Sequence, residues 1–288
     1  MSSTGESTAK GAILITGASS GIGRACALHL DVLGFTVFAG VRKEADGDAL
    51  RAEAPRIRPI IIDVTDRDLV AAAVSEIQTA CPDGLHGLVN NAGIAVVGPV
   101  EALAIEELRR QFEVNVIGQI AVTQALLPLL RKARGRVVIM GSIFGLLSCP
   151  YVGAYAASKY ALEALTDSLR MELVPWGIAV SIVEPGRMAT SIWDKSLGAM
   201  EGWRERNGEI HTLYADSMAA MLRKSSSLAQ TSASPERVAR KVAHALTAKT
   251  PRTRYRVGRD VRFWVPARRI LPDRFCDWVI GLMLGGHT

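Results

Sequence analysis

Cysteine is scarce in this sequence. The 288 residues include four cysteines, Cys26, Cys81, Cys149 and Cys276, and no two of them share the short spacing of zinc ligands or of a disulfide framework. We therefore expect free thiols, no metal site and a reducing, cytoplasmic environment. The first residues also lack the basic start and long apolar run of a secretion signal, so we expect no export.

Long apolar runs are lacking as well. A membrane-spanning helix needs roughly 20 predominantly apolar residues. The best candidate, Trp278 to Leu284, is far shorter. We expect a protein that is soluble, or attached at most to a membrane surface.

Acidic residues are outnumbered, and the basic excess lies toward the end of the sequence. The formal net charge is +6, and Pro251 to Thr288 holds eight Arg against three Asp. No recognised nucleic-acid motif accompanies these arginines, so we expect no nucleic-acid partner and mostly solvated or paired side chains. The alternative is attraction to an anionic membrane surface. Apolar and aromatic side chains interleave with the arginines, namely Phe263, Trp264, Trp278 and Ile280.

Hydrophobic residues, by contrast, are plentiful. They make up 49% of the chain, which is ample for a buried core. No Gly/Ser/Pro-rich linker interrupts the middle of the sequence and no internal repeat is visible. We expect one domain over residues 11–288, preceded by a disordered tail over residues 1–10.

Short apolar runs rich in β-branched residues alternate with longer helical stretches. This pattern predicts the α/β class, with a single doubly wound parallel sheet and helices on both faces, a Rossmann-like fold. The predicted strands are Ala12–Thr16, Thr36–Gly40, Ile57–Ile62, Gly87–Val89, Arg136–Met140 and Ile178–Val183.

Small or polar residues follow each predicted strand. Open α/β sheets bind ligands at the carboxyl ends of their strands, so these residues should meet at one rim. They are the glycine turn that starts at Gly17, Arg42, Asp63, Asn90 to Gly93, Gly141 with Ser142, and Pro185 with Gly186. A rim with hydrogen-bonding groups and little bulk suits a bound dinucleotide.

The glycine turn, Thr16 to Gly23, follows a predicted strand and opens a helix at about Ile22. Its glycines let the backbone approach a ligand closely, and the helix N-terminus offers free N–H groups. This arrangement favours a bound pyrophosphate.

Tyr155 and Lys159 are four residues apart in a predicted helix. Side chains at this spacing lie roughly 5 to 6 Å apart, so the ammonium can favour the phenolate and let the phenol exchange a proton at neutral pH. The pair alone is common by chance on amphipathic helices. Its meaning depends on the glycine turn in the same chain.

In their order along the chain, these motifs resemble those of the short-chain dehydrogenase/reductase family. They are Gly17, Gly21 and Gly23 in the turn, Asn90-Asn91-Ala92-Gly93, Asn115, Ser142, Tyr155 with Lys159, and Pro185-Gly186. The resemblance covers roughly Lys10 to Thr190. The loop Ile143–Val152 and the segment Arg254–Asp260 are similar to the steroid and retinol dehydrogenase branch.

The resemblance implies catalytic roles for four residues. Tyr155 would be the general acid/base, and Lys159 would lower its pKa and hydrogen-bond the nicotinamide ribose. Ser142 would orient the substrate oxygen and stabilise charge there; the alternative is a serine that caps a turn. Asn115 would bend the predicted helix Ile105–Leu130 and hold a water that links Lys159 to solvent; the alternative is a solvent-facing asparagine.

The resemblance also implies a set of cofactor contacts. Asp63 and Val64 resemble the pair that meets the adenine, although Asp63 could equally cap the helix that begins near Asp66. Asn90 would steady the central strand, and Thr190 would lie near the carboxamide. The full set is Gly17, Ser19, Ser20, Gly21, Ile22, Gly23, Arg42, Asp63, Val64, Asn90, Ala92, Gly93, Tyr155, Lys159, Pro185, Gly186 and Thr190.

The end of the second predicted strand favours NADP(H) over NAD(H). An acidic residue at this point accepts bonds from the ribose 2′-hydroxyl, whereas a basic residue receives a 2′-phosphate. Here the strand end carries Arg42, and the first carboxylate is Glu44. NAD(H) remains the alternative.

In this family the stretch over about 187–230 is a lid over the substrate. Here it is rich in Met and Trp, which suits a bulky apolar substrate, although these side chains could equally form a helix core or a subunit interface. The candidate substrate-lining residues are Phe144, Leu146, Cys149, Met188 and Trp193.

The resemblance thus implies an enzyme acting on a lipophilic secondary alcohol or ketone of steroid, retinoid or lipid type. The rival hypothesis is a nucleotide-sensing or scaffold protein without turnover. We expect a homodimer or homotetramer, paired through the helices Ile105–Leu130 and Val152–Val174, and a basic, aromatic C-terminal extension over about 251–288.

Overall fold

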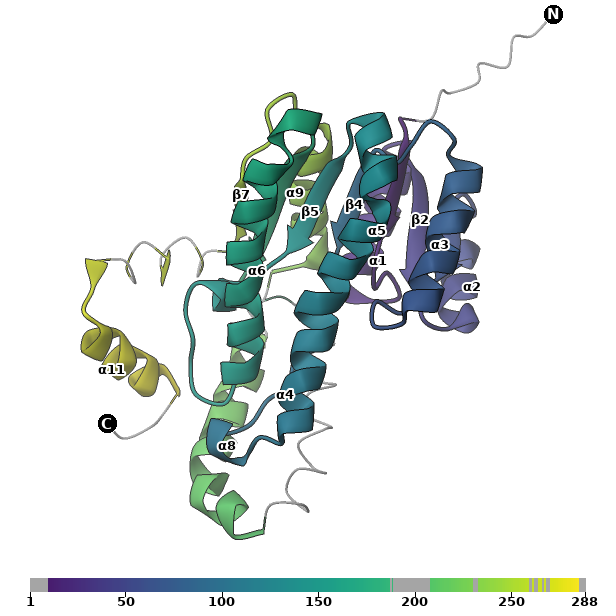
Figure 1. The fold of residues 1–288 in the computed structure, drawn as a ribbon. Helices are drawn as coiled ribbons and strands as arrows, with labels where there is room; N and C mark the ends of the chain where they lie inside the picture. Colours follow the sequence, from purple (N-terminus) through teal and green to yellow (C-terminus); the bar gives the residue numbers. More distant parts are fainter. Residues whose placement is uncertain are drawn as a thin grey trace, which may run out of the picture.

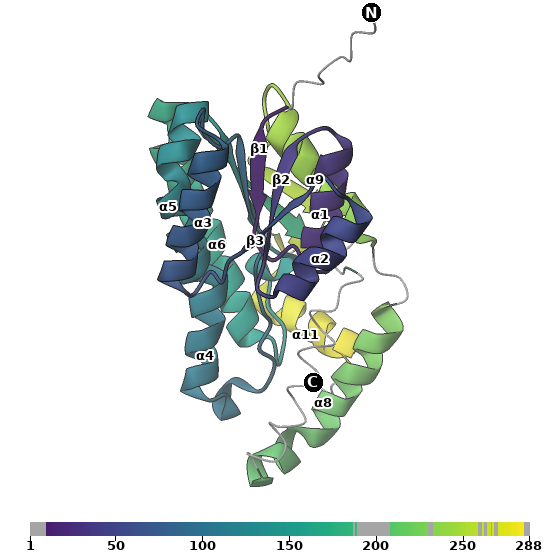
Figure 2. The same cartoon turned by 90° about the vertical axis from the view of Figure 1, so that its right-hand side faces the viewer.

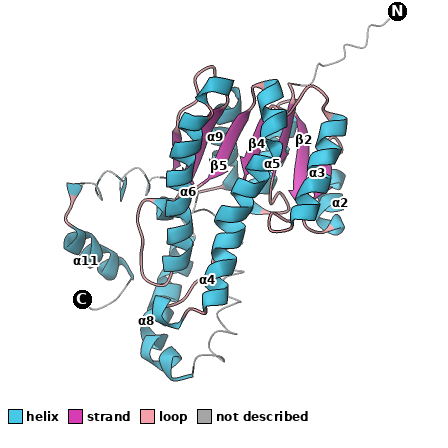
Figure 3. Cartoon of the chain, in the orientation of Figure 1, coloured by secondary structure: helices cyan, strands magenta, loops and turns pink. Residues whose placement is uncertain are grey.

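The computed structural model describes residues 10–186, 188, 208–229, 233–258, 261, 264, 265, 267 and 270–284. Within these residues seven parallel strands form one sheet in the order β3-β2-β1-β4-β5-β6-β7 (Figure 3). They are β1 (Ala12–Ile15), β2 (Thr36–Val41), β3 (Arg58–Ile61), β4 (Gly87–Asn90), β5 (Arg136–Met140), β6 (Ala179–Pro185) and β7 (Arg254–Val257). The predicted doubly wound parallel sheet is confirmed.

Helices cover both faces of the sheet (Figure 2). One face carries α1 (Gly21–Val32), α2 (Glu44–Glu53) and α9 (Pro235–Thr247), and the other carries α3 (Arg67–Ala80), α5 (Gly118–Ala133) and α6 (Gly153–Glu172). Each face buries its own apolar cluster against the strands. The central strands are therefore buried on both sides, which explains why they read as continuous apolar runs.

The six predicted strands are confirmed to within two residues at each end. The seventh, β7, was not predicted as a strand because its sequence, Arg-Tyr-Arg-Val, alternates between half-exposed arginines and buried apolar residues. That alternation fits a strand with one side-chain face in the core and the other face partly exposed. β7 pairs with β6 and is the last strand in the order of the described sheet.

The strand order reverses at β1, which pairs with β2 on one side and with β4 on the other. Ligands of open α/β sheets bind at such a reversal, outside the carboxyl ends of the strands. Here the glycine turn after β1 lies beside the Asn90–Gly93 segment after β4, as the hydrogen bonds between Asn91 and Gly17 show.

The predicted helix Ile105–Leu130 is one helical stretch in three parts. It consists of α4 (Ile105–Phe112), a π-helical turn η2 (Glu113–Ile117) and α5. By length and composition alone, Ile105–Ala133 is the one described helix that could cross a membrane. Half of its most apolar window is buried in the fold. The sequence prediction had instead named Trp278 to Leu284 as the best candidate.

Two helices, α8 (Gly208–Ala229) and α11 (Asp273–Leu284), lie beyond the carboxyl ends of the strands and contact each other (Figure 1). Except for Lys10, the predicted tail 1–10 lies outside the described residues. So does much of the predicted lid 187–230, including Thr190 and Trp193.

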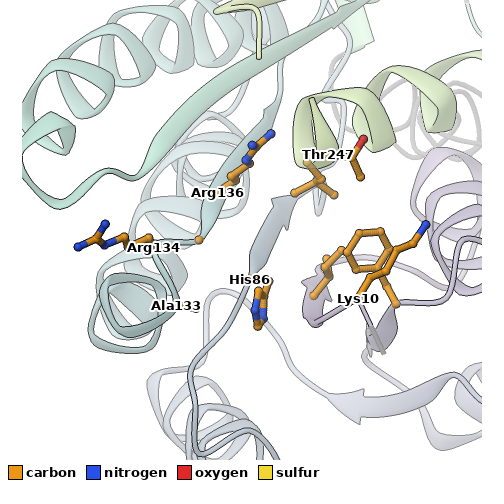
Figure 4. A pocket seen from close by; sticks show the side chains of 10 residues that line it. Lys10, His86, Ala133, Arg134, Arg136 and Thr247 are labelled. Atoms are coloured by element: carbon orange, nitrogen blue, oxygen red, sulfur yellow. The ribbon is translucent and has the colours of Figure 1, made fainter. Parts of the chain in front are cut away.

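A surface cavity of about 310 Å³ lies at the opposite rim of the sheet, by the amino ends of β1, β4 and β5 (Figure 4). Lys10, His86, Arg134 and Arg136 line it together with apolar side chains. The side chain of Arg134 points away from His86 (Figure 4), so these basic groups do not converge on one point. This cavity is separate from the rim that carries the predicted site residues.

Candidate active site

The glycine turn has the backbone conformation that its sequence predicts. Gly17 and Gly21 have φ values of 65° and 55°, in the left-handed region that favours glycine. Ser20 precedes α1 in an extended conformation, and its side chain makes no capping hydrogen bond. The first N–H groups of α1 therefore remain available to an anionic ligand.

Asn91 and Thr16 hold this turn in place. The side-chain amide of Asn91 donates to the backbone oxygens of Thr16 and Gly17, each at 3.0 Å. The Thr16 hydroxyl accepts from the backbone N–H groups of Asn91 and Ala92, also at 3.0 Å. Sequence reasoning missed both residues as supports of the turn, although both lie inside motifs it had singled out.

Glycine is required where these two segments meet. A Cβ on Gly17 would lie 2.9 Å from the Cα of Ala92, and a Cβ on Gly23 would lie 2.2 Å from the Gly17 oxygen. Asn90 is fully buried, and its amide donates to the Thr123 hydroxyl at 2.7 Å, which ties β4 to α5.

Ser142, Tyr155 and Lys159 come together at the end of β5. Ser142 follows β5, whereas Tyr155 and Lys159 lie on one face of α6, and all three are buried. Tyr155 is hydrogen-bonded to Ser142. The Lys159 ammonium lies 5.6 Å from the centre of the Tyr155 ring and donates to the Met140 backbone oxygen at 2.7 Å.

The electrostatics differ from the expectation in one respect. Lys159 was expected to lower the pKa of Tyr155, but burial raises the pKa of this phenol to about 12, and the hydrogen bond with Ser142 offsets only part of the rise. Burial also lowers the pKa of the Lys159 ammonium to about 8, partly offset by the Glu163 carboxylate. Desolvation disfavours the charged form of both groups. Here it outweighs the favourable interaction expected between a nearby ammonium and phenolate.

Asn115 lies in the π-helical turn η2 and is fully buried, so the solvent-facing alternative is excluded. Its oxygen accepts from the Ile94 N–H at 2.8 Å, and its amide donates to the Ile94 oxygen at 3.0 Å and to the Ser158 hydroxyl at 3.2 Å. The π-turn interrupts the regular helix at the point where the Asn115 side chain is hydrogen-bonded to the loop after β4. The predicted bend of the helix and the water link to Lys159 stay predictions.

Gln111 and Ser158 extend this arrangement and were missed from sequence. Gln111 is fully buried one turn before Asn115; it accepts from the Val96 N–H at 2.7 Å and donates to the Ile94 oxygen at 3.0 Å. The Ser158 hydroxyl donates to the Tyr155 backbone oxygen at 2.7 Å. The signal in the sequence was two amide side chains four residues apart, which places them on one face of the predicted helix.

Apart from Thr190, which lies outside the described residues, the other predicted cofactor residues lie along the same rim. Asp63 accepts from Thr65, and it is Asp66 that caps α3, so the capping alternative for Asp63 is wrong.

Val64 is buried against Gly118, and Arg42 is exposed directly after β2. Ser19 and Ile22 lie in the glycine turn and the first turn of α1, and the Gly186 N–H donates to Val257 just after Pro185 ends β6.

Phe144 lies beside Tyr155. Its ring meets the ring of Tyr155 edge to face, with centroids 6.1 Å apart. Phe144 packs against two apolar clusters. One contains Cys149 and Met218 of α8, and the other contains Leu146 together with Val261, Trp264 and Val265. Three of the predicted substrate-lining residues therefore belong to apolar clusters around Tyr155.

Met188 lies elsewhere. It is buried in the apolar cluster on the α1 and α9 face, and it bridges to Ala233. This position corresponds to the core alternative for the Met-rich stretch. Burial raises the pKa of the Cys149 thiol to about 12, which suits a packing role. Within the described residues no cluster of His, Cys, Asp or Glu could hold a metal ion.

Comparison with known proteins decides the family. The family model for short chain dehydrogenases matches residues 11–200. The chain belongs to the short-chain dehydrogenase family. The family predicted from the motifs is thus confirmed, and with it an oxidoreductase that acts on alcohol or carbonyl groups with a nicotinamide cofactor.

The similar proteins include members of the predicted branch. Mouse retinol dehydrogenase 5 is 39% identical over 284 residues, which cover 94% of this chain and 88% of the relative. The bovine (Bos taurus) 17-beta-hydroxysteroid dehydrogenase type 6 is 38% identical over 279 residues, covering 93% and 87%. A solved short-chain dehydrogenase from Streptomyces avermitilis superimposes with a TM-score of 0.73 at 32% identity, covering 90% of this dehydrogenase and 92% of that chain.

Proposed function

We propose that this dehydrogenase is an NADP(H)-dependent enzyme that interconverts a lipophilic secondary alcohol and its ketone, of steroid, retinoid or lipid type, with Tyr155 as general acid/base. The observation that carries the proposal is the grouping of Ser142, Tyr155 and Lys159 at the end of β5, next to the ring of Phe144. Polar proton-transfer groups and an apolar wall meet there.

The rim fits a dinucleotide. The uncapped start of α1 offers N–H groups to the pyrophosphate, and the tight approach of Gly17 to Ala92 keeps side chains out of its path. Asp63 and Val64 would hold the adenine end, and Lys159 the nicotinamide ribose. When bound, the nicotinamide supplies or accepts the hydride.

Arg42 supports NADP(H) over NAD(H). It is exposed directly after β2, where a guanidinium can bind a 2′-phosphate through paired hydrogen bonds. The nearest carboxylate in sequence, Glu44, lies in the first turn of α2. NAD(H) is the alternative cofactor.

The chain's own residues manage the proton. The Ser142 hydroxyl orients the substrate oxygen beside the Tyr155 phenol, which donates a proton during reduction and accepts one during oxidation. The Lys159 cation favours the phenolate through the transition state. Burial of both groups strengthens this charge interaction, because few waters screen it.

Apolar walls on two sides of Phe144 support a lipophilic substrate. Met218 of α8 lies in one cluster, and Val261, Trp264 and Val265 of the C-terminal extension lie in the other. The functions named for the retinol and 17-beta-hydroxysteroid dehydrogenase relatives agree with such a substrate.

We also propose a homodimer or homotetramer in the cytoplasm, with at most peripheral membrane contact. Exposed apolar side chains on the α4–η2 stretch and on α6 support pairing through these helices: Ile105, Ile117, Tyr160 and Leu165. Exposed apolar side chains in and before α11 support surface contact: Ile270, Phe275, Trp278 and Leu282.

The test is turnover with NADPH and NADH side by side, on separate steroid, retinoid and fatty carbonyls, for the wild-type protein and Arg42→Ala. We expect turnover with NADPH, and a rise in the KM for NADPH but not for NADH in Arg42→Ala. Turnover with NADH alone would overturn the cofactor assignment. Tight cofactor binding without turnover of any carbonyl or matching alcohol would favour the nucleotide-sensing hypothesis.

A further inference from the structure

A partly buried network of charged side chains lies next to Lys159 along α6. Arg254 of β7 donates from Nε to Glu163 of α6 at 3.1 Å and from Nη2 to Asp167 at 2.7 Å. The same Nε lies 3.4 Å from Glu184 of β6, whose other oxygen accepts from Arg256 at 3.1 Å. The network joins the catalytic helix to the last two strands of the sheet.

Glu163 is the member of this network that faces the catalytic pair. It follows Lys159 by one helical turn, so their side chains are neighbours on the same face of α6. The Glu163 side chain and the Lys159 backbone pack beneath Gly145, where a Cβ would lie 3.2 Å from the Glu163 Cγ and 3.0 Å from the Lys159 backbone oxygen. Only 7% of Glu163 is exposed, and its Oε1 has no hydrogen-bond partner.

A buried carboxylate with one unpaired oxygen is costly unless nearby positive charge stabilises it. Arg254 supplies part of that charge, but it is shared among Glu163, Asp167 and Glu184. The ammonium one turn away is the remaining cation close to Glu163 on α6. Conversely, Lys159 is buried, and its ammonium donates to the backbone oxygen of Met140.

We propose that Glu163 is a positioning residue whose carboxylate, held by Arg254, acts as the counter-charge that keeps Lys159 protonated beside Tyr155. The effect of Glu163 on catalysis rests on the proposed function. Its effect on the protonation of Lys159 does not depend on that function. The role goes beyond the serine, tyrosine, lysine and asparagine of the family motif, and it links β7 to proton transfer.

Burial acts on both groups of this pair. Burial, and then the nearby Glu184, raise the pKa of Glu163 to about 7, while Arg254 offsets part of the rise. Burial lowers the pKa of Lys159 to about 8, and the nearby Glu163 carboxylate offsets part of this fall. The charged groups around Glu163 are Lys159 and Asp167 on α6, Glu184 on β6 and Arg254 on β7; the loop at Gly145 contributes no titratable group.

The test reads the charge of Lys159 directly in the protein without cofactor. Protein labelled with ¹³C-lysine is titrated by NMR, and the Lys159 Cε signal is assigned by its loss in Lys159→Arg. In Glu163→Gln we expect the titration midpoint of Lys159 to fall by about 1 pH unit, the smallest shift typical of a close opposite charge. An unchanged midpoint would overturn the proposal.

Two further variants separate charge from packing. Asp167→Asn removes another Arg254 partner one turn farther along α6, and we expect it to leave the Lys159 midpoint in place. Glu163→Asp keeps the charge and should restore most of the midpoint, even if Glu163→Gln folds poorly. Equal shifts in Glu163→Gln and Glu163→Asp would assign the effect to packing and would contradict a counter-charge role.

Turnover distinguishes this inference from the proposed function. In an active enzyme, the fall of alcohol oxidation at high pH should begin at lower pH in Glu163→Gln, because Lys159 loses its charge earlier. If the wild-type protein turns over no alcohol or carbonyl but its Lys159 midpoint still moves in Glu163→Gln, the proposed function fails and this inference stands.

Discussion

The ring of Phe144 packs edge to face on the ring of Tyr155, with centroids 6.1 Å apart and planes at 77°. Tyr155 is therefore oriented by an apolar neighbour as well as by Ser142. Phe144 also packs against two apolar clusters, so a single side chain connects α8, the C-terminal extension and Tyr155.

Replacing Phe144 with Ala should weaken substrate binding. An edge-to-face aromatic pair contributes about 0.5 to 1.5 kcal/mol beyond its buried area. We expect the KM for a lipophilic ketone to rise about 10-fold, which corresponds to about 1.4 kcal/mol, while cofactor affinity stays the same. Steady-state kinetics with Phe144→Leu as an apolar control checks this; an unchanged KM in Phe144→Ala would contradict the assignment of Phe144 to the substrate wall.

Replacing Asn91 with Ala should weaken cofactor binding. The change removes two hydrogen bonds to the glycine turn, and each typically contributes about 0.5 to 1.5 kcal/mol. We expect the dissociation constant for NADPH, measured by fluorescence titration, to rise about 10-fold. Thr79→Ala removes one exposed hydrogen bond on α3 and serves as the control; a similar loss of affinity there would count against a specific role for Asn91.

The contact between Tyr151 and α8 should affect the binding of substrate and not the binding of cofactor. The Tyr151 hydroxyl and the Ser217 hydroxyl are 2.6 Å apart, which ties α8 to the segment before α6. Tyr151→Phe and Ser217→Ala should each raise the KM for substrate, and the double variant should do no more than either change alone. Additive effects of the two changes would show that the hydrogen bond does not mediate them.

Glu163 should make stability depend on pH. Its pKa in the folded protein is raised to about 7 from an ordinary value of 4.5, so the protonated form favours folding. This stabilisation is fully present below about pH 4.5 and is lost as pH rises through 7. Urea unfolding should therefore show a smaller difference in the free energy of unfolding between pH 5 and pH 8 in Glu163→Gln than in the wild-type protein. An equal difference in both would refute the raised pKa.

The sequence predicted the parts of the fold whose residue types are dictated by chemistry. The glycine turn was predictable because Gly17 and Gly21 adopt backbone angles that other residues rarely do. The buried strands were predictable because burial on both faces produces apolar runs. The grouping of Ser142 with Tyr155 was predictable only through family resemblance, since the two residues come from separate segments that the fold brings together.

The parts that escaped prediction depend on neighbours distant in sequence. The support of Thr16 by Asn91 arises because β1 pairs with β4, 73 to 76 residues later in the chain. The raised pKa of Tyr155 reflects its burial in the folded protein, which residue spacing on a helix cannot reveal. Likewise, Met188 is a core residue because it faces α9 and not the active-site loop.

The most direct test of the account is to compare wild-type protein with Tyr155→Phe for two quantities, the dissociation constant for NADPH and the kcat for carbonyl reduction. The change removes one hydroxyl and keeps the ring that packs on Phe144. We predict unchanged NADPH affinity and a fall in kcat of at least about 100-fold, the lower range for losing a general acid. Substantial turnover by Tyr155→Phe would contradict the proposed role of Tyr155 as the proton donor.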